Sequence, residues 1–334
     1  MLAKLSQLIV GLGVVAVALV VGLAAAGLIN PSSFLDAADA PSSRPTHAGS
    51  PSVQRSPDAP RATAGPGEMV VMVGAGDIAD CERQQDSLTA DALERIDGIV
   101  FTLGDHAYPD ASAEDFEKCY GPTWGRPSIK DRTRPTIGDD DYDTSGAAPY
   151  FEYFGEAAGD PATGYYAYDA GAWRVYVINS VCRVIGGCGA GSAEEAWLRA
   201  DLKGNPRECV LAMWHKPYFT SEPSGGSDSM RQMWRVLYEE GADVVLNGDH
   251  HAYERFAAQT PAGELDEKRG IVEFVVGTGG GAPESFGTPL PNSIVRAERV
   301  SGVLRLELSP TSYRFEFIDV AGTDVSDRGE RACH

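Results

Sequence analysis

Five short apolar stretches of the sequence each end in an acidic residue or a histidine. The side chains at these five ends are Asp77, Asp105, Asp139, His215 and the adjacent trio Asp249, His250 and His251. Carboxylate oxygens and imidazole nitrogens are ligands for divalent and trivalent metal ions. Two such ions, about 3.5 to 4 Å apart and sharing one carboxylate, can hold a phosphate and activate water near neutral pH. A lone Gly-Asp pair is ordinary in turns, as at Gly159-Asp160, but its repetition after apolar stretches predicts a metal centre.

The apolar stretches have the length of buried β-strands, and amphipathic segments lie between several of them. Apolar residues recur at helical spacing in residues 86–96, 192–202 and 229–240. This alternation of strands and helices predicts an α/β fold. In such a fold the loops at the carboxyl ends of parallel strands form the ligand-binding edge, so the five ends are expected at one rim. Further strand patterns predict a second, packed sheet, and they occupy residues 164–180, 270–280, 302–310 and 312–322.

Composition narrows the class of protein. The chain has 334 residues, 43% of them hydrophobic, and a formal net charge of -20. This apolar content suffices for a buried core, which excludes a wholly disordered chain. Four basic and three acidic residues give residues 1–66 a charge of +1, so residues 67–334 carry -21. A surface this acidic repels a nucleic-acid backbone, and no nucleic-acid partner is expected.

The first 66 residues differ in character from the remainder. Residues 1–30 contain a long uncharged apolar run and are either a signal peptide or a transmembrane anchor. An Ala-x-Ala site at Ala38 to Ala40 favours cleavage, whereas the length of the run favours an anchor. Residues 31–66 are rich in Pro, Ser and Ala and are predicted to be a disordered linker. Both alternatives place residues 67–334 outside the cell, secreted or at the cell surface, with membrane contact only through an uncleaved segment.

All six cysteines follow the linker, and an even number in an exported chain favours disulfides. None shows the CxxC spacing of a zinc site. Cys182 and Cys188 lie in one loop and are predicted to pair. The pairs Cys81–Cys119 and Cys209–Cys333 are a hypothesis, because six cysteines allow about 15 connectivities.

At these strand ends the chain resembles the calcineurin-like metallophosphoesterases, and among them the purple acid phosphatase-like branch. The family blocks are, in order, GD, GDxxY, GNH followed by Asp or Glu, a strand ending in His, and GHxHxYER. Their counterparts here are Gly76-Asp77, Gly104 to Tyr108, Gly138 to Asp141, Ala212 to His215 and Gly248 to Arg255. The likeness spans roughly residues 69–320. It implies a four-layer sandwich in which two packed mixed β-sheets are flanked by helices.

The resemblance also implies the metal ligands. Those of the first metal are Asp77, Tyr108 and His251. Those of the second metal are His215, Asp139 and Asp249, and Asp105 would bridge the two metals. Asp139 replaces an Asn of the family pattern and Asp249 replaces a His, and each keeps an oxygen ligand. Tyr108 marks the purple branch, in which a phenolate supports a ferric ion; the alternative is an ordinary packed aromatic.

Asp140 is the most serious departure from the family pattern. It stands where the family has a histidine that stabilises the transition state and helps to protonate the leaving group, so the rate is threatened more than binding. One possibility is that Asp140 stays protonated among other carboxylates and acts as the catalytic acid. Another is that His106 or His250, which lie inside the motifs, substitute for it. The plain alternative is that both histidines only support the site or lie on the surface.

The carried-over ligands hold two more carboxylates than the family pattern. The resemblance implies two ions of Fe, Mn or Zn. The extra negative charge favours hard cations such as Mg or Ca and opposes phosphate, so weak phosphate affinity is expected. The predicted function is that of an exported phosphoesterase, most simply an acid phosphatase-like phosphomonoesterase that uses metal-activated water on a small phosphate ester. The alternative is a catalytically degenerate fold that binds metal or a ligand.

Two segments are expected to be loops at the edge of the site: Gly277 to Gly281 and Thr220 to Ser229. Each either shapes substrate access or is a plain connection.

Overall fold

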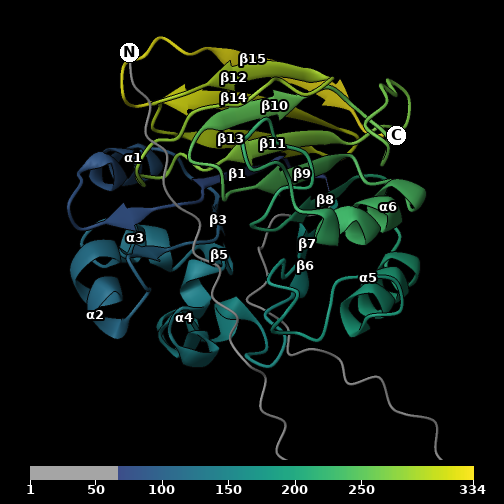
Figure 1. Ribbon diagram of the computed structural model, residues 1–334. Coiled ribbons are helices and arrows are strands. Elements are labelled where there is room, and N and C mark those ends of the chain that lie inside the picture. Colours follow the sequence, from purple (N-terminus) through teal and green to yellow (C-terminus); the bar gives the residue numbers. More distant parts are fainter. Residues whose placement is uncertain (1–66) are drawn as a thin grey trace, which may run out of the picture. The chain divides into compact units, whose positions relative to one another are not determined.

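Two mixed β-sheets form the centre of the computed structural model, which describes residues 67–334 (Figure 1). The first sheet has the strand order β15 (Asp327–Ala332), β14 (Ser312–Asp319), β13 (Gly302–Ser309), β1 (Val70–Ala75), β3 (Ile99–Leu103) and β5 (Thr133–Thr136). The second has the order β12 (Ser293–Ala297), β10 (Tyr253–Phe256), β11 (Val272–Val276), β9 (Val244–Asn247), β8 (Val210–Met213), β7 (Trp173–Val177) and β6 (Tyr166–Ala170). A short pair joins β2 (Ala79–Asp80) to β4 (Ala107–Tyr108).

The apolar stretches become the parallel strands at the middle of each sheet. β1, β3 and β5 run parallel in the first sheet, with Val73 opposite Val100. β7, β8, β9 and β11 run parallel in the second sheet, with Ala212 opposite Val245. Every residue of β3, β5, β8, β9 and β11 is buried, as expected of parallel strands covered on both faces.

Helices flank both sheets (Figure 1). On the side of the first sheet lie α1 (Gln85–Leu93), α2 (Ala113–Asp115), α3 (Pro127–Lys130) and α4 (Ala148–Phe154). On the side of the second sheet lie α5 (Ala193–Gly204) and α6 (Arg231–Glu239). Short turns of π- or 3₁₀-helix occupy Phe116–Tyr120, Asp140–Tyr142, Ser145–Ala147, Gly155–Ala158 and Asp228–Met230. The three predicted helices are α1, α5 and α6.

Two buried apolar clusters explain the layering. One joins the two sheets, with Phe101 from β3 and Phe274 from β11 fully buried in it, and extends to the helices beside the first sheet, as at Tyr150. The other packs α5 and α6 on the second sheet and includes Leu198, Trp234 and Val245. The predicted α/β architecture, two packed mixed sheets flanked by helices, is therefore confirmed.

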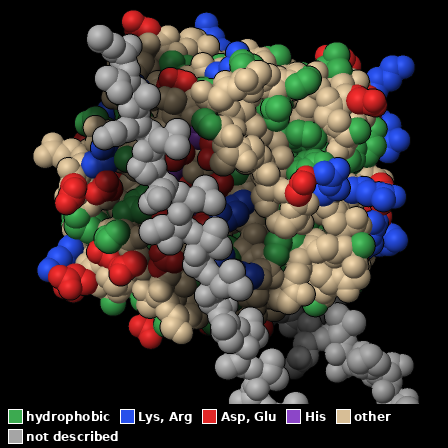
Figure 2. Space-filling view, viewed as in Figure 1, with side chains coloured by type: hydrophobic (Ala, Val, Ile, Leu, Met, Phe, Trp, Pro, Cys, Tyr) green, Lys and Arg blue, Asp and Glu red, His purple; other side chains and the backbone are tan. Residues whose placement is uncertain are grey.

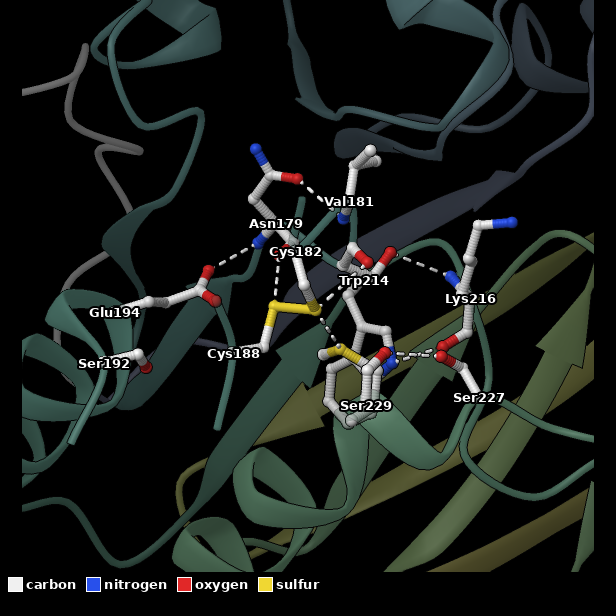
Figure 3. Close-up of a disulfide and its surroundings, with 12 residues drawn as sticks. Asn179, Val181, Cys182, Cys188, Ser192, Glu194, Trp214, Lys216, Ser227 and Ser229 are labelled. Carbon is white, nitrogen blue, oxygen red and sulfur yellow. Dashed lines mark hydrogen bonds between the residues drawn. A yellow bond between two sulfur atoms is a disulfide. The ribbon is translucent and has the colours of Figure 1, made fainter. Parts of the chain in front are cut away.

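The six cysteines form three disulfides, and all three predicted pairs are confirmed. They are Cys81–Cys119, Cys182–Cys188 and Cys209–Cys333. Figure 3 shows the second of these in the loop that follows β7. No helix within residues 67–334 is long and apolar enough to cross a membrane. The predicted signal peptide or anchor and the linker fall in residues 1–66, outside the described part of the chain.

Candidate metal centre

The five predicted ligand-bearing ends meet at the junction of the two sheets. Asp77, Asp105 and Asp139 follow β1, β3 and β5 of the first sheet, whereas His215 and Asp249 follow β8 and β9 of the second. The sequence predicts one rim, and the structure shows that two sheets share it. The backbone helps to shape this rim, because three of the aspartates have positive φ angles: 59° at Asp77, 51° at Asp105 and 69° at Asp249.

Tyr108 and His251 form one cluster with Asp77. The hydroxyl of Tyr108 lies 3.0 Å from Nε2 of His251 and 3.3 Å from Oδ1 of Asp77. Nε2 of His251 is in turn 3.3 Å from Oδ1 of Asp77. Nδ1 of His251 lies 2.6 Å from the carbonyl oxygen of Ala282, a contact that fixes the ring and directs Nε2 toward the cluster.

A second cluster surrounds His215, whose side chain is completely buried. Its Nε2 lies 3.3 Å from Asp105 Oδ2, 3.1 Å from Asp139 Oδ1 and 3.5 Å from Asp249 Oδ1. Nδ1 lies 2.7 Å from the carbonyl oxygen of Leu103, so the ring is oriented as in His251. Asp105 also comes within 3.5 Å of the Tyr108 hydroxyl, which makes it the carboxylate shared by the two clusters.

The residues present fit metal ions. Nε2 of His215 is buried without a well-directed hydrogen bond among residues 67–334, although three carboxylates face it. The ligand atoms of Asp77, Asp105 and His215 lie within 4.8 Å of one another, as do those of Asp139, His215 and Asp249. Glycines lie directly against the ligands. A Cβ at Gly138 would stand 2.1 Å from Asp105 Oδ1, and one at Gly248 would stand 2.7 Å from Asp77 Oδ2.

Lys216 belongs to the second cluster, and the sequence patterns missed it. Its Nζ lies 2.7 Å from Asp139 Oδ2 and 3.3 Å from Asp249 Oδ1. The available signal was its position directly after the strand-ending His215. Burial lowers the pKa of Lys216, but Asp249 and Asp139 outweigh burial and raise the pKa above its usual range. One of the two additional negative charges is therefore matched by an ammonium group.

The imidazoles are strongly basic in this acidic environment. Burial lowers the pKa of His215, but Asp105 and Asp139 raise that pKa well above its usual range. Burial likewise opposes protonation of His251, yet Asp77 and Glu284 help to raise its pKa to about 9. Burial, and then Asp77 and Asp105, raise the pKa of the Tyr108 phenol well above its usual value. A cation that binds here must therefore displace protons from its ligands.

Asp140 lies at the edge of the same site. Its backbone N–H donates to Oδ1 of Asp105 over 3.1 Å. Burial, followed by repulsion from Asp105 and Asp139, raises the pKa of the Asp140 carboxyl to about 7. These surroundings favour the protonated form of Asp140, and its role as the catalytic acid remains a prediction.

His106 lies beneath the site and does not face it. Both of its ring nitrogens are occupied, with Nδ1 2.9 Å from Asp141 Oδ2 and Nε2 2.7 Å from the Thr102 hydroxyl. The side chain is fully buried, and its ring contacts aromatic side chains such as Tyr150 and Phe154. His106 thus has no free ring nitrogen and no exposed surface, and its catalytic role stays a prediction that these contacts do not support.

His250 is also fully buried. Its Nδ1 lies 3.4 Å from the Thr220 hydroxyl, and its ring meets Phe286 edge-on with centroids 4.7 Å apart. These contacts connect it to the neighbouring loops rather than to the ligand atoms.

The glycine-rich loop from Gly277 to Gly281 packs directly on the site. A Cβ at Gly277 would lie 2.8 Å from Asp77 Oδ2. On the face shown in Figure 2, acidic side chains lie next to the small area of histidine surface that is visible, which is not the fully buried His250.

Known proteins with similar sequences are plant phosphatases. The chain is 31% identical to purple acid phosphatase 18 of Arabidopsis thaliana over 126 residues, which cover 35% of this chain and 28% of that protein. It is 32% identical to purple acid phosphatase 15 of the same plant over 130 residues, covering 37% and 23% of the two chains. The chain thus spans about a quarter of the length of these relatives. No family model matches it.

Solved structures share the fold over most of the chain. Purple acid phosphatase from yellow lupin (Lupinus luteus) seeds aligns with a TM-score of 0.67 at 15% identity, covering 80% of this chain and 54% of that one. GAP50 of Plasmodium aligns with a TM-score of 0.62 at 10% identity, covering 80% and 89%. PhoD aligns with a TM-score of 0.55 at 11% identity, covering 79% and 68%.

The partial matches to purple acid phosphatases, together with the fold shared with the lupin enzyme, support a likeness to the calcineurin-like metallophosphoesterases and to their purple acid phosphatase-like branch. The resemblance inferred from the sequence motifs is confirmed.

Proposed function

We propose that this chain is an exported, metal-dependent phosphoesterase that hydrolyses small phosphomonoesters at a two-metal centre. The observation that carries the proposal is the position of Asp105 between the two clusters. Its Oδ2 lies 3.3 Å from Nε2 of His215 and 3.5 Å from the Tyr108 hydroxyl. A carboxylate shared by two sets of ligands is what a pair of closely spaced ions requires.

The ligand roles follow from the two clusters. Asp77, Tyr108 and His251 would hold the first ion, and Asp139, His215 and Asp249 would hold the second. When bound, such ions polarise a phosphate ester and lower the pKa of water. The carbonyl contacts of both histidines direct their Nε2 atoms toward the neighbouring carboxylates. The four aspartates favour hard cations such as Mn, Mg or Ca beside the Fe or Zn expected of the family.

Asp140 supplies the proton for the leaving group in this proposal. It takes the sequence position of the family histidine, and burial and the neighbouring carboxylates of Asp105 and Asp139 raise its pKa in the metal-free site, which favours the protonated form. A neutral carboxyl group also avoids adding a further negative charge to a site that must accept a phosphate. The proposed enzyme is therefore most active below neutral pH, as an acid phosphatase is.

A catalytically degenerate metal- or ligand-binding protein is the second candidate. It is favoured by Asp140 itself, because the family histidine is missing, and by the ammonium of Lys216 beside two proposed ligands. GAP50, which shares the fold, is described as the anchor in the inner membrane complex of Plasmodium. Activity measurements separate the two candidates.

The proposal is tested by stripping the full-length protein of metal and reloading it with Mn, Fe, Zn, Mg or Ca. Hydrolysis of p-nitrophenyl phosphate and of bis(p-nitrophenyl) phosphate is then compared at pH 5.5. We expect turnover that depends on added metal and favours the monoester. A folded protein without turnover on either ester, with any ion, would favour the binding protein.

Export is proposed from the apolar amino-terminal run and is supported by the three disulfides, which persist in oxidising compartments. Intact-mass measurement of protein recovered from the medium and from membranes distinguishes its two forms. A mass that begins after Ala40 indicates a cleaved signal peptide, and a full-length mass in the membrane fraction indicates an anchor. Full-length protein confined to the cytosol would contradict export.

A further inference from the structure

The two aspartates proposed for the second metal ion share a lysine. Nζ of Lys216 lies 2.7 Å from Asp139 and 3.3 Å from Asp249, whereas Nε2 of His215 lies 3.1 and 3.5 Å from the same two carboxylates. An ammonium group and an imidazole thus approach one pair of carboxylates together. A metal ion at this cluster and the ammonium group would need the same two carboxylates.

The two aspartates present their oxygen atoms to these partners in different ways. Asp139 directs Oδ1 at His215 and Oδ2 at Lys216, so each partner has its own oxygen. Asp249 directs the same atom, Oδ1, at both partners. An ion held by His215 and Asp249 Oδ1 would therefore lie close to Nζ, where two positive charges repel each other.

The backbone of Lys216 is fixed, but its side chain is free to withdraw. The Lys216 N–H donates to the Ser180 hydroxyl over 3.0 Å, and the Lys216 carbonyl accepts from Nε1 of Trp214 over 2.8 Å. Figure 3 shows these contacts beside the Cys182–Cys188 disulfide, with the lysine side chain extending away from them. That side chain is 29% exposed, so the ammonium can leave the carboxylates for water.

We propose that Lys216 is a built-in competitor of the second metal ion. The cluster of Asp77, Tyr108 and His251 then binds its ion first, and the cluster of Asp139, His215 and Asp249 binds an ion only when the ammonium leaves Asp249. The two sites therefore differ in affinity, and occupancy of the second is set by the concentration of available metal. This inference rests on the proposed two-metal function.

The test is a titration of metal-free, full-length protein with Mn²⁺, in which electron paramagnetic resonance measures the free ion. The variants are Lys216→Met, Lys216→Arg, which keeps the charge, and Lys203→Met, which removes an exposed lysine of α5. We expect two sites in the wild-type protein, the second at least tenfold weaker than the first. Lys216→Met should tighten the second site at least tenfold, whereas Lys216→Arg and Lys203→Met should leave it weak.

Other outcomes separate the inference from the proposed function. If Lys216→Met leaves the second site unchanged or weakens it, Lys216 orients Asp139 and does not compete, and only this inference is overturned. If neither wild-type nor Lys216→Met protein binds Mn²⁺ at two sites, the two-metal centre fails and the inference fails with it. Repeating the titration of Lys216→Met in an Asp249→Asn background should abolish the tightening, because the contested oxygen belongs to Asp249.

A second measurement uses the wild-type chain alone, so it does not depend on how the variants fold. Acetic anhydride labels lysines whose amines are free, and peptide mass mapping reports each site. Labelling of Lys216 should rise at least threefold as the second Mn²⁺ equivalent is added, while labelling of the exposed Lys203 should stay constant. Labelling of Lys216 that is unchanged by the second equivalent would overturn the competition.

Discussion

Nε2 of His215 lies 3.3 Å from Oδ2 of Asp105, and this contact joins the end of β8 in one sheet to the end of β3 in the other. The site thus depends on how the two sheets are packed. The buried cluster between the sheets, with Phe101 and Phe274 inside it, sets that packing. The geometry of the site and the stability of the fold therefore depend on the same interface.

The pH profile tests the role of Asp140. Its pKa is raised to about 7 in the metal-free site, and bound cations lower it, so activity should fall with rising pH from a midpoint below 7. Asp140→Asn should remove this decline and lower kcat about 100-fold. The loss should be greater with phenyl phosphate, a poorer leaving group, than with p-nitrophenyl phosphate. Superimposable profiles for the two proteins would exclude Asp140 as the acid.

Metal affinity should rise with pH. His251 has a pKa of about 9, so it is protonated at neutral pH and must lose a proton before Nε2 can bind an ion. The dissociation constant for the first Mn²⁺ should therefore fall about tenfold per pH unit between pH 6 and pH 8 for each proton displaced. His251→Asn should bind more weakly and show a shallower dependence. A dissociation constant for the wild-type protein that does not change over this range would contradict the assigned ligand.

Glu194 provides a prediction about stability that does not involve metal. Its carboxyl accepts from the Asn179 N–H over 2.7 Å, and burial raises its pKa from 4.5 to about 8. The unfolded chain therefore releases this proton at lower pH than the folded chain. The free energy of unfolding should fall between pH 4.5 and pH 8, by up to about 1.4 kcal/mol per pH unit.

Glu194→Gln keeps an oxygen for the Asn179 N–H and removes the titration. In urea unfolding, this variant should lose that part of the pH dependence and should be more stable than the wild-type chain at pH 8. Glu114→Gln is a matched control, because Glu114 is an exposed residue in the first turn of α2. Equal slopes for wild-type and Glu194→Gln proteins would show that folding does not raise the pKa of Glu194.

Removing either of two disulfides should lower the stability of the fold by a different amount. Cys209–Cys333 closes a separation of 124 residues and ties the end of the chain beyond β15 to the start of β8, whereas Cys182–Cys188 closes a separation of 6. Chain entropy then predicts a cost of about 5 kcal/mol for replacing the long-range pair by serines, against about 2 kcal/mol for the local pair. Denaturant unfolding of the two double variants measures both. The reverse order would mean that effects in the folded state dominate.

The sequence predicts the central strands and their ligands because this information is local. An apolar stretch followed by Gly-Asp specifies both a buried strand and the carboxylate at its end, as at Asp77 and Asp105. The edge strands β12 and β15 were not predicted, because β15 is largely polar and most residues of both strands are exposed or half-buried. Their pairing depends on neighbours that are distant in the sequence.

The orientation of side chains was the harder part of the site to predict. His106 lies inside a ligand motif, yet its ring turns into an aromatic pocket and bonds Asp141. Lys216 carries no motif of its own, and its role appears only when β5 and β9 bring Asp139 and Asp249 to it. His106 and Asp141 are 35 residues apart, and Lys216 and Asp249 are 33 residues apart. Spacing within one motif therefore does not reveal these contacts.

The rate of p-nitrophenyl phosphate hydrolysis by Asp105→Asn, measured with Mn²⁺ at pH 5.5, tests the central claim most directly. Asp160→Asn is the matched control, because Asp160 also follows a glycine but is exposed in a plain turn. If Asp105 is shared by two ions, Asp105→Asn should lower kcat/KM at least ~100-fold and reduce bound metal, while Asp160→Asn should match the wild-type protein. Full activity and full metal content in Asp105→Asn would contradict the two-metal account.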